Sequence, residues 1–482
     1  MNAGDTTLEL IRLFVFLVGA AAIVTILAHR INLPYTVALV GFGIVAGAFA
    51  QPLQLEITPQ LVLVVLLPAL IFEASYQTDF GKLRPSLGGV ALLAGPGVLI
   101  SAAIIAAALH LGAGLAWPQA FVVGAMLSAT DPAAVIATFK RLNSPRRLAT
   151  LVEAESVFND GTGIVIFAIA VDFVARPVGP ADVGLNFVFV VAFSAALGAV
   201  AGWLASRLLP NVGDHLIEIS LSVVLAYGTY LLADAAHLSG VISTAVAGIV
   251  LGNQGRRFGL SEKTLEALDT VWEFVAFLAT AFVFLVVGFA IPVRSLADVA
   301  VPIAWAIVAT LAGRAVIVYG LLGGWRLARR ARLGRGRGTA AAFTAVAAPV
   351  VAAPVVAVVA APVVAVVAAP VVVAVVAPVV PPAARLAGKG SKSPVDEGSM
   401  PLGWLHVVFW SGLRGAVSTA LALSLPVDFP DRAALQGITF GVVLFTLLVQ
   451  ATTADVVVGR WGRKPPRAAK TASALPNPEG AP

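Results

Sequence analysis

One carboxylate lies deep in a long apolar stretch of the sequence. Asp160 stands in the run Asn159–Gly163, and the apolar residues 164–171 follow directly. An ionisable group inside a membrane span is costly and is by default a candidate for function. A carboxylate there can hold a proton or a cation. No soluble-loop interpretation fits Asp160, so we predict that it is a functional residue.

A second candidate is the sequence Thr130-Asp131-Pro132. Pro132 has no N–H and disfavours helix at the residue before it. The helix should therefore unwind at Thr130 and Asp131 and leave free carbonyls and helix ends at mid-membrane, the groups that coordinate cations in broken-helix transporters. The alternative is a simple proline kink in which Asp131 caps the next helical segment.

Residues four apart share a helical face, which places Ser156 beside Asp160 and Glu155 beside Asn159. Glu155 is better explained as a structural residue, and it then needs a cationic partner because a lone buried carboxylate is very costly. Arg414, among small residues in another apolar stretch, is the partner that we favour. The alternative is that Arg414 binds an anionic substrate.

Two further charges have open roles. Glu73 follows apolar residues, but Asp79 comes soon after it, so an interfacial carboxylate and a functional one are equally compatible with the sequence. Arg314 is another buried cation. Asp269 and Glu273 are its candidate partners.

These residues must be positioned by membrane-spanning helices. The chain has 482 residues, of which 59% are hydrophobic and 12% charged, about half the charge of a soluble domain. This composition excludes a soluble globular protein and a nucleic-acid-binding domain. A crossing needs about 20 apolar residues, and the chain offers thirteen candidates: 8–28, 34–50, 59–75, 86–111, 118–139, 149–174, 184–209, 215–234, 238–252, 264–290, 298–323, 401–425 and 433–458.

The basic residues indicate the topology. With thirteen spans, the loops on one side hold nearly all Lys and Arg outside the spans, and the other side holds only Arg176, Arg294 and Arg432. The positive-inside rule makes the crowded side cytoplasmic. We therefore predict an all-α polytopic protein of the cell membrane, in contact with its lipid, with the N-terminus outside and the C-terminus inside.

Thirteen spans divide into six, one linking span and six, so the two halves insert upside down relative to each other, as in many secondary transporters. The alternative is thirteen spans without internal symmetry. With the symmetry, the twelfth span is the inverted mate of the fifth, and two broken helices should cross at the midplane. The predicted domains are spans 1–11 in residues 1–335, a linker in 336–400, spans 12–13 in 401–460 and a cytoplasmic tail in 461–482.

Residues 340–384 consist almost only of Ala, Val and Pro. Prolines repeatedly break the helical hydrogen-bond ladder. We interpret the segment as a poorly ordered linker without chemistry, and a membrane hairpin is the alternative. The chain has no Cys and no HExxH, P-loop or GxSxG pattern, which argues against an enzyme.

Four motifs together are specific: FEAS at 72–75, ATDPAAV at 129–135, ESVFNDGTGIVIF at 155–167 and GLRGAVSTALAL at 412–423. Their order resembles that of the monovalent cation–proton antiporters, in particular the sodium/proton exchanger branch. The resemblance covers roughly residues 8–335 and 400–460, and the segment 340–384 departs from the family pattern.

This resemblance implies a homodimer in which each protomer slides a core domain against a dimerisation domain. It implies that Asp160 carries the transported ion beside Asn159, with oxygen ligands from Thr130, Ser156 and Glu73. Asp131 would balance the helix ends, a Glu155–Arg414 pair would hold the core together, and Arg314 matches another basic position. Asn before Asp implies electroneutral exchange.

The expected function is therefore exchange of a monovalent cation for protons. Na⁺ is the favoured cation, K⁺ or Li⁺ are alternatives, and no cofactor is implied. Hard cations prefer oxygen ligands, so the predicted ligands of the transported Na⁺ are Asp160, Glu73, Ser156 and Thr130. An organic-anion carrier that uses the buried Arg residues is a weaker alternative, because the site is rich in carboxylates. A passive channel would not need broken helices at a titratable Asp.

Overall fold

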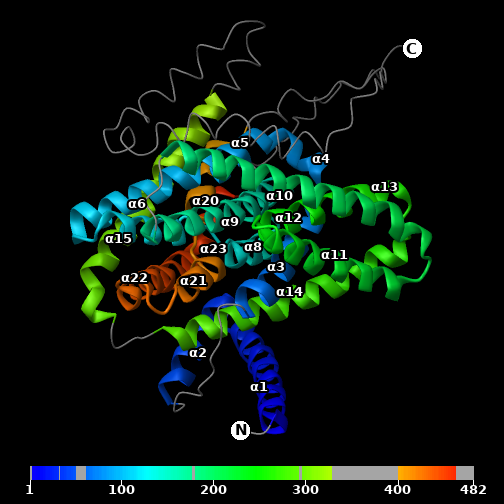
Figure 1. Cartoon of the computed structure of the whole chain (residues 1–482), viewed down its shortest axis with the longest axis horizontal. Helices are drawn as coiled ribbons and strands as arrows, with labels where there is room; N and C mark the ends of the chain where they lie inside the picture. Colours follow the sequence, from blue (N-terminus) through cyan, green and yellow to red (C-terminus); the bar gives the residue numbers. More distant parts are fainter. Residues whose placement is uncertain are drawn as a thin grey trace, which may run out of the picture.

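The computed structural model describes residues 3–31, 33–49, 61–175, 180–291, 296–327 and 400–462, and all regular secondary structure in these ranges is helical (Figure 1). The Ala/Val/Pro segment 340–384 lies outside the described residues, as does nearly all of the predicted tail. The predicted linker and its alternative, a hairpin, therefore stay predictions.

The first part of the chain contains these helices: α1 (Ala3–Arg30), α2 (Tyr35–Phe49), η1 (Leu61–Leu66), α3 (Leu67–Tyr76), α4 (Phe80–Leu83), η2 (Arg84–Ser86), α5 (Leu87–Leu92), η3 (Leu93–Gly97), α6 (Val98–Ala113), α7 (Trp117–Met126), α8 (Ala133–Arg141) and α9 (Arg146–Ala175).

The rest of the chain contains these: α10 (Pro180–Leu208), η4 (Leu209–Asn211), α11 (His215–Ala235), α12 (Gly240–Val250), η5 (Leu251–Gly255), α13 (Arg256–Phe258), α14 (Glu262–Ala290), η6 (Ala297–Val299), α15 (Ala300–Ala315), η7 (Val316–Leu322), α20 (Leu402–Trp410), α21 (Ala416–Leu423), α22 (Arg432–Phe445), η9 (Thr446–Ala451) and α23 (Thr452–Trp461).

Seven of the described helices are long and apolar enough to cross a membrane, and three shorter apolar helices precede them near the N-terminus. Each of the thirteen predicted spans overlaps a described helix or a consecutive set of helices. The fifth and twelfth predicted spans are the two that are split, into α7 and α8 and into α20 and α21.

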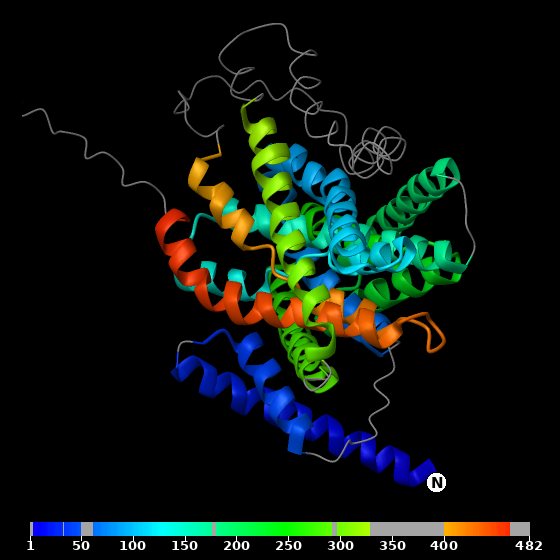
Figure 2. The same ribbon diagram turned by 90° about the vertical axis from the view of Figure 1, so that its left-hand side faces the viewer.

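Packing sorts the helices into two groups. One group is built on contacts of α6 with α7 and α15, of α15 with α22 and of α7 with α9. The other is built on contacts of α2 with α14 and of α12 with α3, α10 and α11. Figure 2 shows α1 and α2 along the lower edge of the molecule, and the two split helices belong to the first group.

Glycines allow the second group to pack closely. Gly43 of α2 and Gly288 of α14 face each other, and a Cβ on Gly288 would lie 2.7 Å from the Cα of Gly43. A Cβ on Gly252 of η5 would overlap the carbonyl oxygen of Tyr76 at the end of α3. Small residues at such contacts let helix backbones approach within a membrane.

Candidate functional site

Two interrupted helices meet at their interruptions. The segment between α7 and α8 spans 127–132, and the segment between α20 and α21 spans 411–415. The backbone N–H of Asp131 donates to the carbonyl of Leu413 at 2.9 Å. The unwinding at 127–132 is the local consequence of Pro132, which cannot donate a helical hydrogen bond.

The Asp131 carboxylate accepts hydrogen bonds from the N-terminal ends of α8 and α21. Its Oδ1 accepts from the N–H of Ala133 at 3.0 Å, and its Oδ2 accepts from the N–H of Ala416 at 3.1 Å. A negative charge is favourable where unpaired N–H groups and the positive end of a helix dipole converge. Gly415 permits this approach, because a Cβ there would overlap the Asp131 carboxylate.

Arg414 donates hydrogen bonds at the opposite ends, the C-termini of α7 and α20. Its Nε donates to the carbonyl of Leu127, and its Nη1 donates to the carbonyl of Gly412 at 2.6 Å. Arg414 is 1% exposed. A cation is favourable beside free carbonyls at helix C-termini, so Asp131 and Arg414 together complement the half-helix ends that meet here.

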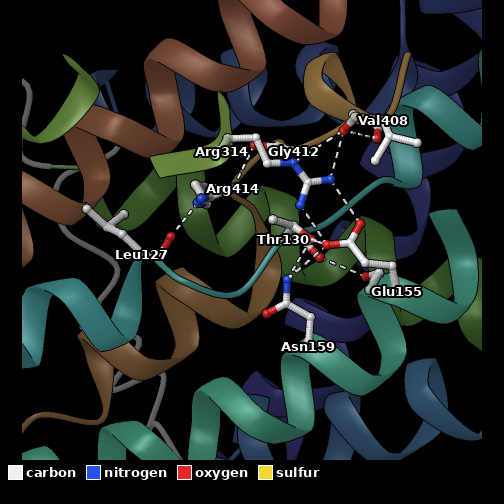
Figure 3. A network of polar contacts seen from close by, with 10 residues as sticks. Leu127, Thr130, Glu155, Asn159, Arg314, Val408, Gly412 and Arg414 are labelled. Carbon is white, nitrogen blue, oxygen red and sulfur yellow. Dashed lines mark hydrogen bonds and ion pairs between the residues drawn. The ribbon is translucent and has the colours of Figure 1, made fainter. Parts of the chain in front are cut away.

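The cationic partner of Glu155 is Arg314, not Arg414. Arg314 Nη1 and Nη2 donate to the two carboxylate oxygens of Glu155 at 2.7 and 2.9 Å, and both residues are less than 5% exposed. Arg314 Nε and Nη2 also donate to the carbonyl of Val408 in α20 (Figure 3).

The prediction of a Glu155–Arg414 pair is therefore wrong, as are Asp269 and Glu273 as candidate partners of Arg314. The physical reason is the local backbone. Arg414 lies within a helix interruption that offers it free carbonyls, whereas Arg314 lies near the end of the continuous helix α15, whose carbonyls are used within the helix. Arg314 reaches one backbone carbonyl, that of Val408, and both oxygens of Glu155 accept its remaining N–H groups.

Asn159, Thr130 and Ser156 form one network with this ion pair. Asn159 Nδ2 donates to Thr130 Oγ1 at 3.0 Å and to Glu155 Oε1 at 3.3 Å. Ser156 Oγ donates to the carbonyl of Thr130 at 2.7 Å. The predicted oxygen ligands on the α7–α8 segment and on α9 thus lie together, and each oxygen keeps lone pairs for a further partner.

Asp160 is the next residue on α9. Its Oδ1 is buried and accepts no hydrogen bond within the described part of the chain. It lies near enough to Asp131 and Glu155 to interact with their charges. The following residue, Gly161, faces α12, where a Cβ would lie 2.8 Å from Ile242 Cγ1. The turn of α9 that carries Asp160 therefore packs through Gly161 on the second helix group.

Glu73 shares no described hydrogen bond with this network. Its Oε1 accepts from Gln77 Nε2 at 2.7 Å on the same helix. The charges that act on it belong to Lys140, Glu153, Asp269 and Glu273. The structure thus joins Thr130, Ser156 and Asn159 by hydrogen bonds, with Asp160 next along α9, whereas the hydrogen bond described for Glu73 is with Gln77.

Crossed half-helices with complementary charges at their ends, packed against a second helix group, define an all-helical membrane protein of the broken-helix transporter class. The family model "Sodium/hydrogen exchanger, transmembrane" matches residues 18–385. This chain belongs to the sodium/hydrogen exchanger family, and it is therefore a multi-pass membrane transporter rather than an enzyme.

Individual relatives agree with the family. The chain is 34% identical to the Na⁺/H⁺ antiporter ApNhaP of Aphanothece halophytica over 449 residues, which cover 92% of this chain and 73% of the relative. It is 33% identical to the low-affinity Na⁺/H⁺ antiporter NhaS1 of Synechocystis over 89% of this chain and 69% of the relative. The fold is similar to that of the sodium proton antiporter MjNhaP1 of Methanocaldococcus jannaschii, with a TM-score of 0.65, 17% identity and coverage of 94% and 99%.

Proposed function

We propose that this chain is a secondary active transporter that exchanges Na⁺ for protons at Asp160. One observation carries the proposal. Of the three carboxylates at the helix interruptions, Asp131 accepts from two helix N-termini and Glu155 is paired with Arg314. Asp160 Oδ1 is buried and accepts no hydrogen bond within the described ranges. A carboxylate in that position is free to take a proton or a cation.

The chemistry of exchange follows from competition. A desolvated carboxylate is neutralised either by a proton or by a bound cation, and holding both is unfavourable. A hard cation at Asp160 would use further oxygens from the Thr130 carbonyl, the Ser156 hydroxyl and Glu73. Asn159 would hold the Thr130 hydroxyl in place through its amide.

Electroneutral exchange follows from the neutral neighbour. Asn159 carries no charge, and its amide donates to Thr130 and Glu155. If Asp160 is the single carboxylate that alternates between partners, one proton leaves for each monovalent cation that enters. Net charge movement per cycle is then zero.

The same proposal includes the architecture. It has thirteen crossings in two inverted six-helix repeats. The distribution of Lys and Arg supports the odd number of crossings, the outside N-terminus and the cytoplasmic C-terminus. The two helix groups would slide against each other near Asp160 and so give alternating access. The remaining elements of the proposal are a homodimer and a location in the cell membrane.

Sodium is favoured because curated relatives at 34% and 33% identity are described as Na⁺/H⁺ antiporters. The test uses purified protein in proteoliposomes with an acidic lumen and a lumenal pH dye. We expect external Na⁺ to alkalinise the lumen at a rate independent of the clamped voltage. K⁺ and Li⁺ added in turn identify the preferred cation, and a response that changes with voltage would contradict electroneutral exchange.

Glu73 gives a separate prediction. If Glu73 supplies an ion ligand, Glu73→Gln should raise the apparent KM for Na⁺ about tenfold, equivalent to ~1.4 kcal/mol, because one charged oxygen donor is lost. Exchange at saturating Na⁺ should persist, since Asp160 is intact. The assay is the initial rate of alkalinisation as a function of Na⁺ concentration.

The matched control for this change is Glu266→Gln, which removes an exposed carboxylate from α14. We expect it to leave the KM unchanged. An unchanged KM in Glu73→Gln would remove Glu73 from the ligand set and leave it with its Gln77 hydrogen bond.

A further inference from the structure

A small polar cavity lies next to the Asn159 network. It leaves space of about 10 Å³ for the centre of a water-sized sphere. Its polar lining comes from α6, from the α7–α8 segment, from α9, from α15 and from the α20–α21 segment: Ser101, Ser128, Thr130, Asn159, Arg314 and Arg414. A cavity of this size accommodates one water molecule.

Two polar atoms in this lining have no partner among the described residues. Ser101 Oγ and Asn159 Oδ1 are both buried and form no hydrogen bond there, and their residues are 3% and 2% exposed. A buried polar atom without a hydrogen bond is costly, and ordered water is its usual partner in native proteins. Ser101 belongs to none of the four motifs on which the family resemblance rests, and nothing in its neighbouring residues marks it as functional.

The charges around the cavity select a neutral ligand. The guanidinium groups of Arg314 and Arg414 line it and would repel a cation. Arg314 is paired with Glu155, Arg414 donates to the carbonyls of Leu127 and Gly412, and Asn159 Oδ1 presents a lone pair, so an anion would find these guanidinium groups already engaged. A molecule that both donates and accepts hydrogen bonds satisfies this lining, and water is the one that fits the volume.

We propose that this cavity is a binding site for one structural water molecule, which donates to Asn159 Oδ1 and forms a hydrogen bond with Ser101 Oγ. The water would fix the orientation of the Asn159 amide. Asn159 Oδ1 would accept from the water while Asn159 Nδ2 donates to Thr130 and Glu155. Ser101 would then be a positioning residue that acts on the α7–α8 segment through water. The effect on Na⁺ rests on the proposed function, whereas the water site itself does not.

The first test is a structure of the full chain at a resolution that shows ordered water. We expect one density peak within ordinary hydrogen-bond distance, about 2.7–3.2 Å, of both Ser101 Oγ and Asn159 Oδ1. Crystals or particles prepared with bromide or with thallous ion test the choice of ligand. An anomalous or heavy-atom peak of either ion in the cavity, or the absence of any peak, would overturn the proposal.

Two substitutions test the role of the water. Ser101→Ala removes one hydrogen-bond partner, and Ser101→Val also fills the space. We expect both to lower the midpoint of thermal unfolding and to raise the apparent KM for Na⁺ several-fold, with the water peak absent in Ser101→Val. The control is Ser206→Ala in α10, whose buried hydroxyl donates to the Gly202 carbonyl of its own helix.

The readouts separate the two proposals. If the unfolding midpoint of Ser101→Ala is no lower than that of Ser206→Ala, the water site is overturned, whatever the transport activity is. A lost water peak with an unchanged KM for Na⁺ would overturn the positioning role. If neither the parent nor the variants exchange ions while the peak and the stability difference are present, the proposed function fails and the water site stands.

Discussion

Asp160→Asn is expected to reduce Na⁺-coupled proton exchange to below detection. Asn is nearly isosteric with Asp but can neither bind a proton in the relevant range nor neutralise a cation. The substitution also removes a buried carboxylate whose Oδ1 has no hydrogen-bond donor among the described residues. Such a carboxylate lowers the free energy of unfolding. We therefore expect the variant to fold, and to be at least as stable as the parent. Exchange is measured in proteoliposomes and stability by thermal unfolding.

Asp172→Asn is the matched control, because Asp172 is on the same helix, α9, but is exposed. It should exchange ions at the parent rate. Residual coupled flux in Asp160→Asn, with Asp172→Asn normal, would show that another group carries the ion.

Arg314→Ala is expected to cost ~3–5 kcal/mol of stability, the range found when one partner of a buried ion pair is removed. Glu155 would keep its carboxylate in the protein interior with only the hydroxyl of Thr130 and the amide of Asn159 as donors. The carbonyl of Val408 would also lose both of its bonds from the guanidinium. The measurement is the shift in unfolding midpoint of the purified variant.

Arg141→Ala is the control for loss of an ion pair as such. Arg141 pairs with Asp455, and both side chains are about 40% exposed. An exposed pair contributes ~0–1 kcal/mol, so this variant should differ little from the parent.

A double-mutant cycle distinguishes the two possible partners of Glu155. We expect a large coupling energy between Glu155→Gln and Arg314→Ala, because they remove the same contact. The coupling between Glu155→Gln and Arg414→Ala should be smaller, since Arg414 donates to the carbonyls of Leu127 and Gly412. The reverse order would restore the pairing that the sequence suggested.

The sequence by itself determined the class of protein and the positions of its helices. The low share of charged residues and the thirteen apolar stretches predict an all-helical membrane protein, since hydrocarbon demands that each backbone polar group be satisfied within the helix. Pro132 predicts the interruption at Thr130 and Asp131, because a proline effect is local and needs no knowledge of neighbours. Local chemistry also marks Asp160, because its apolar surroundings are contiguous in the chain.

The partners of the buried charges were decided only by the tertiary structure. Glu155 and Arg314 are 159 positions apart, and the residue types alone favoured the wrong arginine as the partner of Glu155. The choice depends on which guanidinium reaches the carboxylate and which reaches free carbonyls, and both are properties of helix packing. The placement of Glu73 beside other acidic residues and the cavity between Ser101 and Asn159 have the same origin. Local sequence determines where each segment is helical and where a helix is interrupted. Contacts between distant segments determine which hydrogen-bond and ion-pair partners the buried polar atoms have.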